Sequence, residues 1–441
     1  MGLRLRQTRR CGQHELSAYP RLFQWPYPCA RRVRAHPHRH PGRHVHKNQG
    51  GSGPQILHQR RLHRTAARPQ PVCCLHNLRS DQQPDRTAPR RIRLPHHTGE
   101  NPGRRTSGIP RRAARIRQVS AVSRILIVKP SSLGDVIHAL PTAARLRCRF
   151  PQAHIAWLVN DTLSSLLQRC PVINEIIPFA RHHARQWYPL LRRLRTERFD
   201  LVVDLQGLLR SGIMTIATGA PRRIGLSDAR EGSRLFYNEI VAVPRCHAVD
   251  RYLCVANHLG CEAGPVEFPL GLPSPVSDLR SQISNFKSPI AIHPTARWPT
   301  KLWGDERFAE LVRRLPPDRV VLTGAASERD RIETIAQGRP NLAGKTSLLE
   351  LAELYARCAV VVTNDSGPMH LAAAVGTPVV AIFGPTDPSL TGPYGNRHVV
   401  LRSAVDCSPC FKKHCVHRPP MECMEQVTVE QVLAAVNPFL V

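Results

Sequence analysis

From residue 124 onward, short apolar runs alternate with segments of helical periodicity, and this alternation most restricts the possible fold. The runs at 125–128, 154–159 and 200–204 are rich in β-branched residues, as expected for strands buried on both faces of a parallel sheet. After the first run, apolar residues recur at helical spacing until Ala144. Pro141 interrupts that pattern, so we expect the helix to kink or restart there. The pattern predicts an α/β unit with helices on both faces of its sheet.

The alternation starts again after a passage rich in Pro and Ser at 272–277. Four further apolar runs follow, at 289–293, 319–323, 359–363 and 379–383. We therefore expect two α/β units joined near 270–288. In such an arrangement ligands bind at the carboxyl ends of the strands, in a cleft between the units.

The first 120 residues have a different composition, with 26 basic against 4 acidic residues, or +22 of the chain's formal net charge of +31. With 11 His, 13 Pro and hardly any apolar periodicity, this segment cannot bury enough surface to offset its ordering entropy. We therefore expect residues 1–121 to be a disordered basic tail. Either it is a working arm that binds nucleic acid or anionic membranes, or translation starts near Val122 and the tail is not native. The second interpretation is favoured because no recognition-helix or aromatic-basic pattern accompanies the charge, which also argues against nucleic acid as a partner.

Several classes of protein are excluded by what the sequence lacks. The sequence contains no run of 18 apolar residues, so it predicts no membrane span. It also has no apolar stretch near its start of the kind found in secretory signals. We therefore expect a cytoplasmic protein with reduced thiols. No Gly-x-Gly-x-x-Gly follows a strand, and Arg339 stands where a P-loop ending at Gly344-Lys345 would need its first glycine.

One candidate ligand-binding turn follows the run at 359–363. Asp365 or Ser366 is suited to cap the next helix, whose bare amides beside the small Gly367 would bind phosphate. His370 would lie one turn further on and face the same cleft. Helix capping alone would explain the first two residues but gives no reason for the histidine.

A matching turn follows the run at 125–128. Gly134 permits close approach of the backbone, and Asp135 begins the next helix. This carboxylate either complements the helix dipole, which is worth roughly 0.3–1 kcal/mol, or acts as a general base over the cleft. The residues alone leave both roles open.

Five motifs, in the same order, resemble glycosyltransferase family 9, the ADP-heptose:lipopolysaccharide heptosyltransferases, and are most similar to the type I enzymes. The resemblance covers residues 124–441 and none of the tail. It implies two Rossmann-like domains facing each other across a cleft, the GT-B fold, with the acceptor domain at 122–275 and the nucleotide-sugar domain at 276–441. The motifs lie at 129–138, 204–208, 235–238, 365–370 and 383–388.

The resemblance also implies an activity. Heptose would move from ADP-heptose to a 3-deoxy-octulosonate on lipid A, in the inner core of lipopolysaccharide, with inversion and with Asp135 as the base. The family is regarded as metal-independent, and the chain lacks a carboxylate pair placed for Mg²⁺, so no cofactor is expected. The enzyme would work at the cytoplasmic face of the inner membrane, in peripheral contact with it. Two alternatives are the same family with another sugar or acceptor, and a nucleic-acid-binding protein that uses the basic tail.

On the donor side, Lys301 matches the family's lysine and would meet the charge of the departing diphosphate. Thr295 would bond a phosphate oxygen from the same loop. Glu328 either reaches the ribose or is a solvated residue at a helix start. The expected donor-binding residues are Thr295, Lys301, Glu328, Asp365, Ser366, Gly367 and His370.

On the acceptor side, Arg181 and Arg185 lie in a basic run that would meet an anionic sugar-phosphate lipid, although such runs are also typical of solvated surface. Asp204 ends a strand and alternatively caps the helix that follows. The expected acceptor-binding residues are Ser132, Gly134, Arg181, Arg185, Asp204, Gln206 and Arg230.

Four cysteines near the C-terminus form a weak candidate metal site. Four thiolates can hold tetrahedral Zn²⁺, but this cluster lacks a second Cys-x-x-Cys pair. Reduced thiols or a redox clip are the alternatives. The spacing is Cys407-x2-Cys410-x4-Cys415-x7-Cys423.

Overall fold

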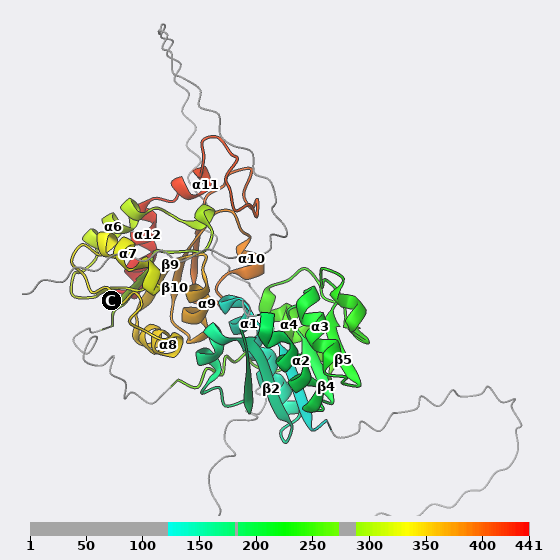
Figure 1. Ribbon diagram of the computed structural model, residues 1–441. Coiled ribbons are helices and arrows are strands. Elements are labelled where there is room, and N and C mark those ends of the chain that lie inside the picture. The colour runs from blue at the N-terminus through cyan, green and yellow to red at the C-terminus, as the bar shows by residue number, and fades with distance from the viewer. Residues whose placement is uncertain (1–121, 181–183, 273–287, 441) are drawn as a thin grey trace, which may run out of the picture. The chain divides into compact units, whose positions relative to one another are not determined.

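The computed structural model describes residues 122–180, 184–272 and 288–440, which all belong to one compact unit (Figure 1). The expected tail at 1–121, Arg181 and most of the expected linker near 270–288 lie outside the described residues. None of the helices in the described part of the chain combines the length and apolar character needed to cross a bilayer.

The first half is a six-stranded parallel sheet in the order β3-β2-β1-β4-β5-β6. Its central strand, β1, is the first apolar run, and Ile125 to Val128 are fully buried. The strands are β1 Arg124–Val128, β2 His154–Asn160, β3 Glu175–Phe179, β4 Leu201–Asp204, β5 Arg222–Leu226 and β6 Glu239–Val241. The helices are α1 Leu133–Arg149, α2 Trp187–Thr196, α3 Leu209–Ala217 and α4 Ala248–His258, with short 3₁₀ turns η1 Asp161–Leu167, η2 Ala184–Gln186 and η3 Ser233–Phe236.

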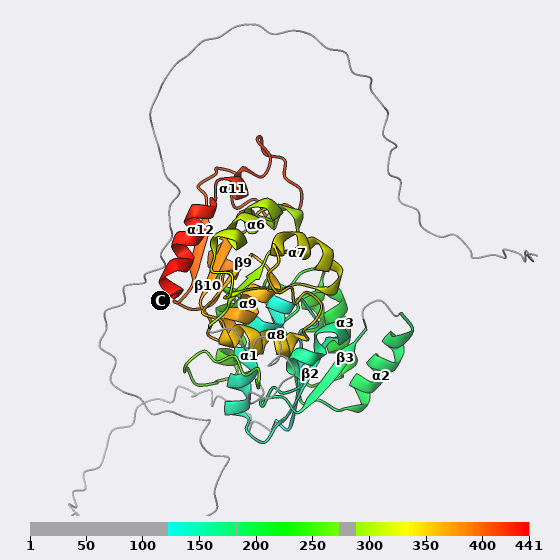
Figure 2. The ribbon, with the colours of Figure 1, turned by 90° about the vertical axis from the view of Figure 1, so that its left-hand side faces the viewer.

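The second half is a five-stranded parallel sheet in the order β11-β10-β9-β7-β8, covered by helices (Figure 2). Its strands are β7 Ile290–His293, β8 Val320–Leu322, β9 Val360–Asn364, β10 Val379–Phe383 and β11 Val399–Arg402. Its helices are α6 Asp305–Arg314, α7 Arg329–Ala336, α8 Leu348–Arg357, α9 Gly367–Ala374, α10 Pro388–Thr391, α11 Glu422–Glu425 and α12 Val429–Val436, with 3₁₀ turns η4 Pro299–Lys301, η5 Ala326–Glu328 and η6 Asn437–Phe439. The prediction of two Rossmann-like α/β units is confirmed.

Helix α1 corrects one expectation. It runs without interruption from Leu133 to Arg149, so it does not restart at Pro141. The proline lacks the N–H of a helical hydrogen bond. Ile137 and Leu140, on the same turn, are fully buried, and this packing holds the helix together across the missing bond.

The two halves share part of their hydrophobic core. One cluster of buried residues contains Leu140 of α1 and Tyr252 of α4 together with Leu371 of α9 and Phe383 of β10. Helix α1 packs directly against α9. Since α1 follows β1 and α9 follows β9, the turns after these two central strands come together.

Candidate active site

Two glycines make the close packing of α1 on α9 possible. A Cβ atom at Gly134 would lie 2.3 Å from Cδ2 of His370, and one at Gly367 would lie 2.9 Å from Cδ2 of Leu133. Each glycine therefore admits a side chain of the opposite helix. We expected Gly367 to leave space for a phosphate, but Leu133 fills the space beside its Cα atom.

Histidines link the two halves beside these glycines. Nε2 of His138 lies 3.0 Å from Nδ1 of His370, and both side chains are buried. The ring of His247 lies 5.3 Å from that of His138, and its Nε2 lies 3.0 Å from the carbonyl oxygen of Gly392. Sequence reasoning missed His138 and His247 as site residues. The available signal was that His138 follows Asp135 by three positions and so shares its helix face.

Burial keeps the linked imidazoles neutral. It lowers the pKa of His370 to about 4, against the opposing effect of the Asp365 charge. Burial, with the charges of His370 and His247, also lowers the pKa of His138 well below its ordinary value. At neutral pH one ring therefore donates the shared hydrogen bond and the other accepts it.

Asp135 is held from two sides. Its Oδ2 accepts hydrogen bonds from the backbone N–H of Ser132 at 3.0 Å and from the Ser132 hydroxyl at 2.8 Å. Its Oδ1 accepts one from the Tyr252 hydroxyl at 3.2 Å and lies 3.7 Å from Nζ of Lys129. The carboxylate thus caps α1, as one interpretation predicted, yet its side chain stays 39% exposed.

The charge of Asp135 is stabilised by these contacts. Burial alone raises the pKa of Asp135, but the Lys129 charge and the hydrogen bonds from Ser132 outweigh it and hold that pKa well below its usual range. Lys129 is itself buried; its Nζ donates to the carbonyl oxygen of Leu205 at 3.1 Å and lies 5.0 Å from the centre of the Tyr252 ring. Sequence analysis missed Lys129 and Tyr252, the latter because it lies 117 residues beyond Asp135, on α4.

Lys301 and Asp365, two of the expected donor residues, form an ion pair with Nζ and Oδ2 2.6 Å apart. The Thr386 hydroxyl donates to the same carboxylate oxygen at 2.5 Å. The carboxylate therefore fixes the ammonium group at the start of α9. Ser366 is the N-cap residue but makes no side-chain capping bond, so the amides of the first turn have no acceptor from that side chain.

Thr295 and Glu328, two further expected donor residues, contact each other. The Thr295 hydroxyl donates to Oε2 of Glu328 at 3.0 Å and lies 3.1 Å from Nε2 of His293. Oε2 of Glu328 also accepts the backbone N–H of Ala325 at 2.8 Å. Glu328 thus has the contact expected of a helix-start residue. It also lies beside Thr295, the residue predicted to bond a phosphate oxygen of the donor.

Asp204 requires a correction on the acceptor side. It is fully buried, and Oδ1 accepts the backbone N–H groups of Gln206 and Gly207 at 2.8 and 3.1 Å. Oδ2 accepts the Tyr237 hydroxyl at 2.7 Å. Its carboxylate is therefore enclosed by the protein and closes the turn after β4, so it is not placed for direct contact with an acceptor. It does not cap α3 either, since the N-cap residue of that helix is Leu208.

Of the remaining acceptor candidates, Gln206 is tied to the turn that carries Asp135, and the two arginines are not. Oε1 of Gln206 accepts the backbone N–H of Ser131 at 3.2 Å, which ties the turn after β4 to the turn that carries Asp135. Arg230 and Arg185 are exposed, Arg185 in η2. The structure therefore connects Gln206 to the site and shows the two arginines only as surface cations.

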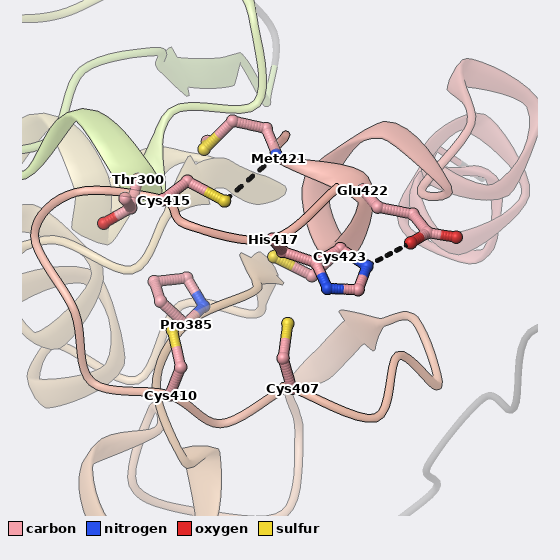
Figure 3. Close-up of a pocket in the computed structure, with 9 residues that line it drawn as sticks. All are labelled: Thr300, Pro385, Cys407, Cys410, Cys415, His417, Met421, Glu422 and Cys423. Carbon is pink, nitrogen blue, oxygen red and sulfur yellow. Dashed lines mark hydrogen bonds and ion pairs between the residues drawn. The ribbon is translucent and has the colours of Figure 1, made fainter. Parts of the chain in front are cut away.

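The four cysteines line one pocket (Figure 3). In the described residues, no three His, Cys, Asp or Glu side chains stand in a metal-binding arrangement. The pocket is lined by Thr300, Pro385, Cys407, Cys410, Cys415, His417, Met421, Glu422 and Cys423.

Comparisons with known proteins agree with this arrangement. The model of glycosyltransferase family 9 (heptosyltransferase) matches residues 187–420. The chain is 33% identical to lipopolysaccharide heptosyltransferase 1 of Pseudomonas aeruginosa over 325 residues, which is 68% of this chain and 89% of that protein. It is 29% identical to lipopolysaccharide heptosyltransferase 1 of Escherichia coli K12 over 301 residues, or 64% of this chain and 93% of that protein.

Two solved structures have the same fold. The E. coli ADP-heptose lipopolysaccharide heptosyltransferase II superposes with a TM-score of 0.59 at 28% identity, covering 72% of this chain and 98% of that one. The E. coli heptosyltransferase WaaC with ADP gives a TM-score of 0.61 at 25% identity, covering 72% and 99%. Both are GT-B proteins, so the expected fold class is confirmed.

Proposed function

The chain belongs to glycosyltransferase family 9, the heptosyltransferases, and on that premise we propose that it transfers heptose from ADP-heptose to the inner core of lipopolysaccharide. Relatives named lipopolysaccharide heptosyltransferase support the product class, and a related structure named for its complex with ADP supports the donor. The acceptor in this proposal is a 3-deoxy-octulosonate on lipid A.

The observation that carries the proposal is the packing of α1 on α9. Through Gly134 and His370, the turn that bears Asp135 adjoins the turn that bears Asp365 and Ser366. A carboxylate from one half and a helix N-terminus from the other thus adjoin. Such a pair suits a reaction in which an acceptor hydroxyl must lose a proton while a diphosphate departs.

We propose Asp135 as the base. The acceptor oxygen attacks the anomeric carbon, the bond from that carbon to the ADP oxygen breaks, and the hydroxyl proton passes to Asp135. Attack from the face opposite ADP inverts the configuration. Because its pKa is depressed, Asp135 is ionised throughout the working pH range. A weak base is sufficient because the hydroxyl becomes strongly acidic as its oxygen bonds to carbon.

Negative charge develops on the departing diphosphate. We propose that Lys301 and the first-turn amides of α9 stabilise it without a divalent ion. Asp365 keeps the Lys301 ammonium in position before the donor binds, since their atoms are 2.6 Å apart. Thr295, beside Glu328, would add a hydroxyl to the diphosphate site.

Exposed arginines of the first half, Arg185 and Arg230, would meet the anionic glycolipid, and Gln206 would line the inner end of that path. We propose that the enzyme works in peripheral contact with the cytoplasmic face of the inner membrane. A vesicle-binding assay with anionic and with neutral lipids tests this contact directly.

A transfer assay with Asp135→Asn tests the central assignment. We expect kcat to fall by a factor of about 10² or more because the amide cannot accept the proton, while the affinity for ADP stays unchanged. Asp161→Asn, at an exposed carboxylate on η1, is the matched control. Substantial residual transfer by Asp135→Asn would exclude Asp135 as the base. A panel of other nucleotide sugars and NMR of the product test the donor and the inversion.

A further inference from the structure

We propose that His138 is a positioning residue for the transfer. Its Nε2–H donates to Nδ1 of His370, which leaves the His370 proton on Nε2, where it donates to the diphosphate of the sugar nucleotide. The identity of this ligand rests on the proposed function. The direction of the hydrogen bond rests only on the contacts between the rings and their neighbours.

The third histidine of the cluster, His247, has both ring nitrogens occupied. The backbone N–H of Val249 donates to its Nδ1 at 3.2 Å, so that nitrogen carries no proton. Its Nε2 lies 3.0 Å from the carbonyl oxygen of Gly392, which can only accept, so the proton is on Nε2. Among the described residues, the side chain of His138 therefore has no hydrogen bond other than the one it shares with His370.

The enclosed nitrogen of His138 decides the direction of that bond. Its Nδ1 is buried and has no partner in the described part of the chain. If His370 donated, the neutral His138 ring would carry its proton on Nδ1, as a buried N–H without an acceptor. If His138 donates from Nε2, its Nδ1 is left as a lone pair, and in protein interiors an acceptor without a donor is less rare than an N–H without an acceptor. This second arrangement also gives both rings the Nε2–H form, which is the more stable tautomer of neutral histidine in water.

The other nitrogen of His370 lies where the two turns meet. A Cβ atom on Gly134 would lie 2.9 Å from Nε2 of His370, so this nitrogen lies against the residue that precedes Asp135. On its own helix, His370 lies one turn after Ser366, the N-cap residue of α9. Its Nε2 has no hydrogen-bond partner among the described residues, and unlike Nδ1 of His138 it is not fully enclosed. A ligand between the two turns can therefore reach it.

A proton on Nε2 matches the chemistry of the departing group. Diphosphate oxygens accept hydrogen bonds, so they pair with an N–H and not with a bare ring nitrogen. Their charge grows as the bond to the sugar breaks, so this hydrogen bond is stronger in the transition state than with bound substrate. Because burial lowers the pKa of His370 to about 4, the neutral ring donates without placing a second cation beside Asp135.

NMR of the full chain labelled with ¹⁵N-histidine, at pH 7.5, tests the direction of the bond. The signals of His370 are those that disappear in His370→Gln. We expect a protonated Nε2 and an unprotonated Nδ1 in the wild type, and a shift of the Nε2–H signal when ADP is added. The proposal is overturned if the proton is on Nδ1, if both nitrogens are protonated, or if saturating ADP leaves the Nε2–H signal unmoved.

A pair of variants at His138 tests the positioning role. His138→Met removes the donor and keeps most of the side-chain volume, whereas His138→Gln keeps an N–H at a similar reach. Removal of an oxyanion donor itself costs roughly 10²–10³ in kcat, so for the loss of its positioning partner we expect His138→Met to lower kcat by about tenfold or more. The KM for ADP-heptose should change less, and His138→Gln should regain most of the loss. His414→Gln, at an exposed histidine, is the control and should keep the wild-type kcat.

Melting temperatures show that the variants compared are folded. A wild-type kcat in His138→Met would overturn the proposal, as would an equal loss of kcat in His138→Met and His138→Gln when both are folded. If His138→Met does not fold, the wild-type NMR result decides. That result needs no transfer activity, so a wild-type chain that transfers no heptose would contradict the proposed function while the direction of the bond is still measured.

Discussion

At the scale of single residues, the setting of Asp135 is decided by groups that are distant in sequence. Ser132 caps its helix locally, whereas Lys129 comes from the end of β1 and Tyr252 from α4. The buried ammonium of Lys129 is the largest of the influences that lower the pKa of Asp135. It acts through the carboxylate, so Lys129 is a positioning residue.

The variant Lys129→Met removes this charge and keeps most of the side-chain volume. The pKa of Asp135 then rises, because burial is no longer opposed by a cation. Transfer needs the ionised carboxylate, so the acidic limb of the kcat/KM profile should move to higher pH. Rates measured between pH 4 and 9 test this, with Lys345→Met at an exposed lysine as control. An unmoved acidic limb would contradict the proposed coupling.

The buried histidines predict a second pH effect, on stability. The pKa of His370 is lowered to about 4 from the model-peptide value of 6.5, so the unfolded chain binds more protons than the folded chain between these values. Stability contributed by the neutral ring is present above pH 6.5 and is lost as the pH falls toward 4, up to about 3 kcal/mol. Denaturant unfolding at several pH values between 4 and 7 measures how steeply the free energy of unfolding falls with pH.

The variant His370→Gln identifies the source of this slope. It should flatten the pH dependence of the free energy of unfolding in that window. His414→Gln, at an exposed histidine of the loop between β11 and α11, should not. Equal slopes in the wild type and His370→Gln would mean that other groups cause the acid destabilisation.

At the scale of elements, the contact between α1 and α9 is the feature on which the proposed reaction depends. Gly134→Ala places a methyl group 2.3 Å from the His370 ring, which must shift or force the helices apart. Overpacking of this kind costs about 1–3 kcal/mol. We expect a larger loss of transfer than of ADP affinity, because the base moves relative to the donor while the donor site stays intact.

The matched control is Gly264→Ala, where an added Cβ meets nothing within 4 Å. Stability and kinetics of the two variants are compared by thermal unfolding and by initial rates. Normal kcat in Gly134→Ala would show that this packing is not required for transfer.

Element by element, the sequence predicts the almost fully buried strands, including β8 at the edge of its sheet, and misses the partly buried ones, including β5 in the interior of the first sheet. The runs that became β1, β2, β4, β7, β8, β9 and β10 have continuous apolar character because both of their faces are covered. Strands such as β3 and β11 are only partly buried, with patterns that mix exposed and buried positions, so no run marks them. The continuity of α1 through Pro141 was missed because burial on the sheet is a tertiary effect.

At the scale of the whole molecule, the sequence predicted that the two turns meet across one cleft, but it did not predict the contacts that join them. Asp135, Lys301, Asp365 and His370 were identified from motifs. The hydrogen bond between His138 and His370 joins residues 232 positions apart, and no local pattern specifies such a pairing. Asp204 was misassigned because a strand-end carboxylate has the same sequence signature whether it faces a ligand or closes its own turn.

Binding of ADP at the donor site should raise the melting temperature of the whole folded chain. ADP that binds only the folded chain stabilises it by mass action, by about 2.7 kcal/mol at 100 times its dissociation constant. Lys301→Ala removes the cation that Asp365 holds and leaves that buried carboxylate without its ion-pair partner, so we expect a smaller ADP-induced rise in melting temperature than in the wild type. Lys345→Ala serves as the control. An equal rise in wild type and Lys301→Ala would exclude Lys301 from the donor site. If the rise is reduced in Lys301→Ala but not in Asp135→Asn, then Lys301 binds the donor and Asp135 does not.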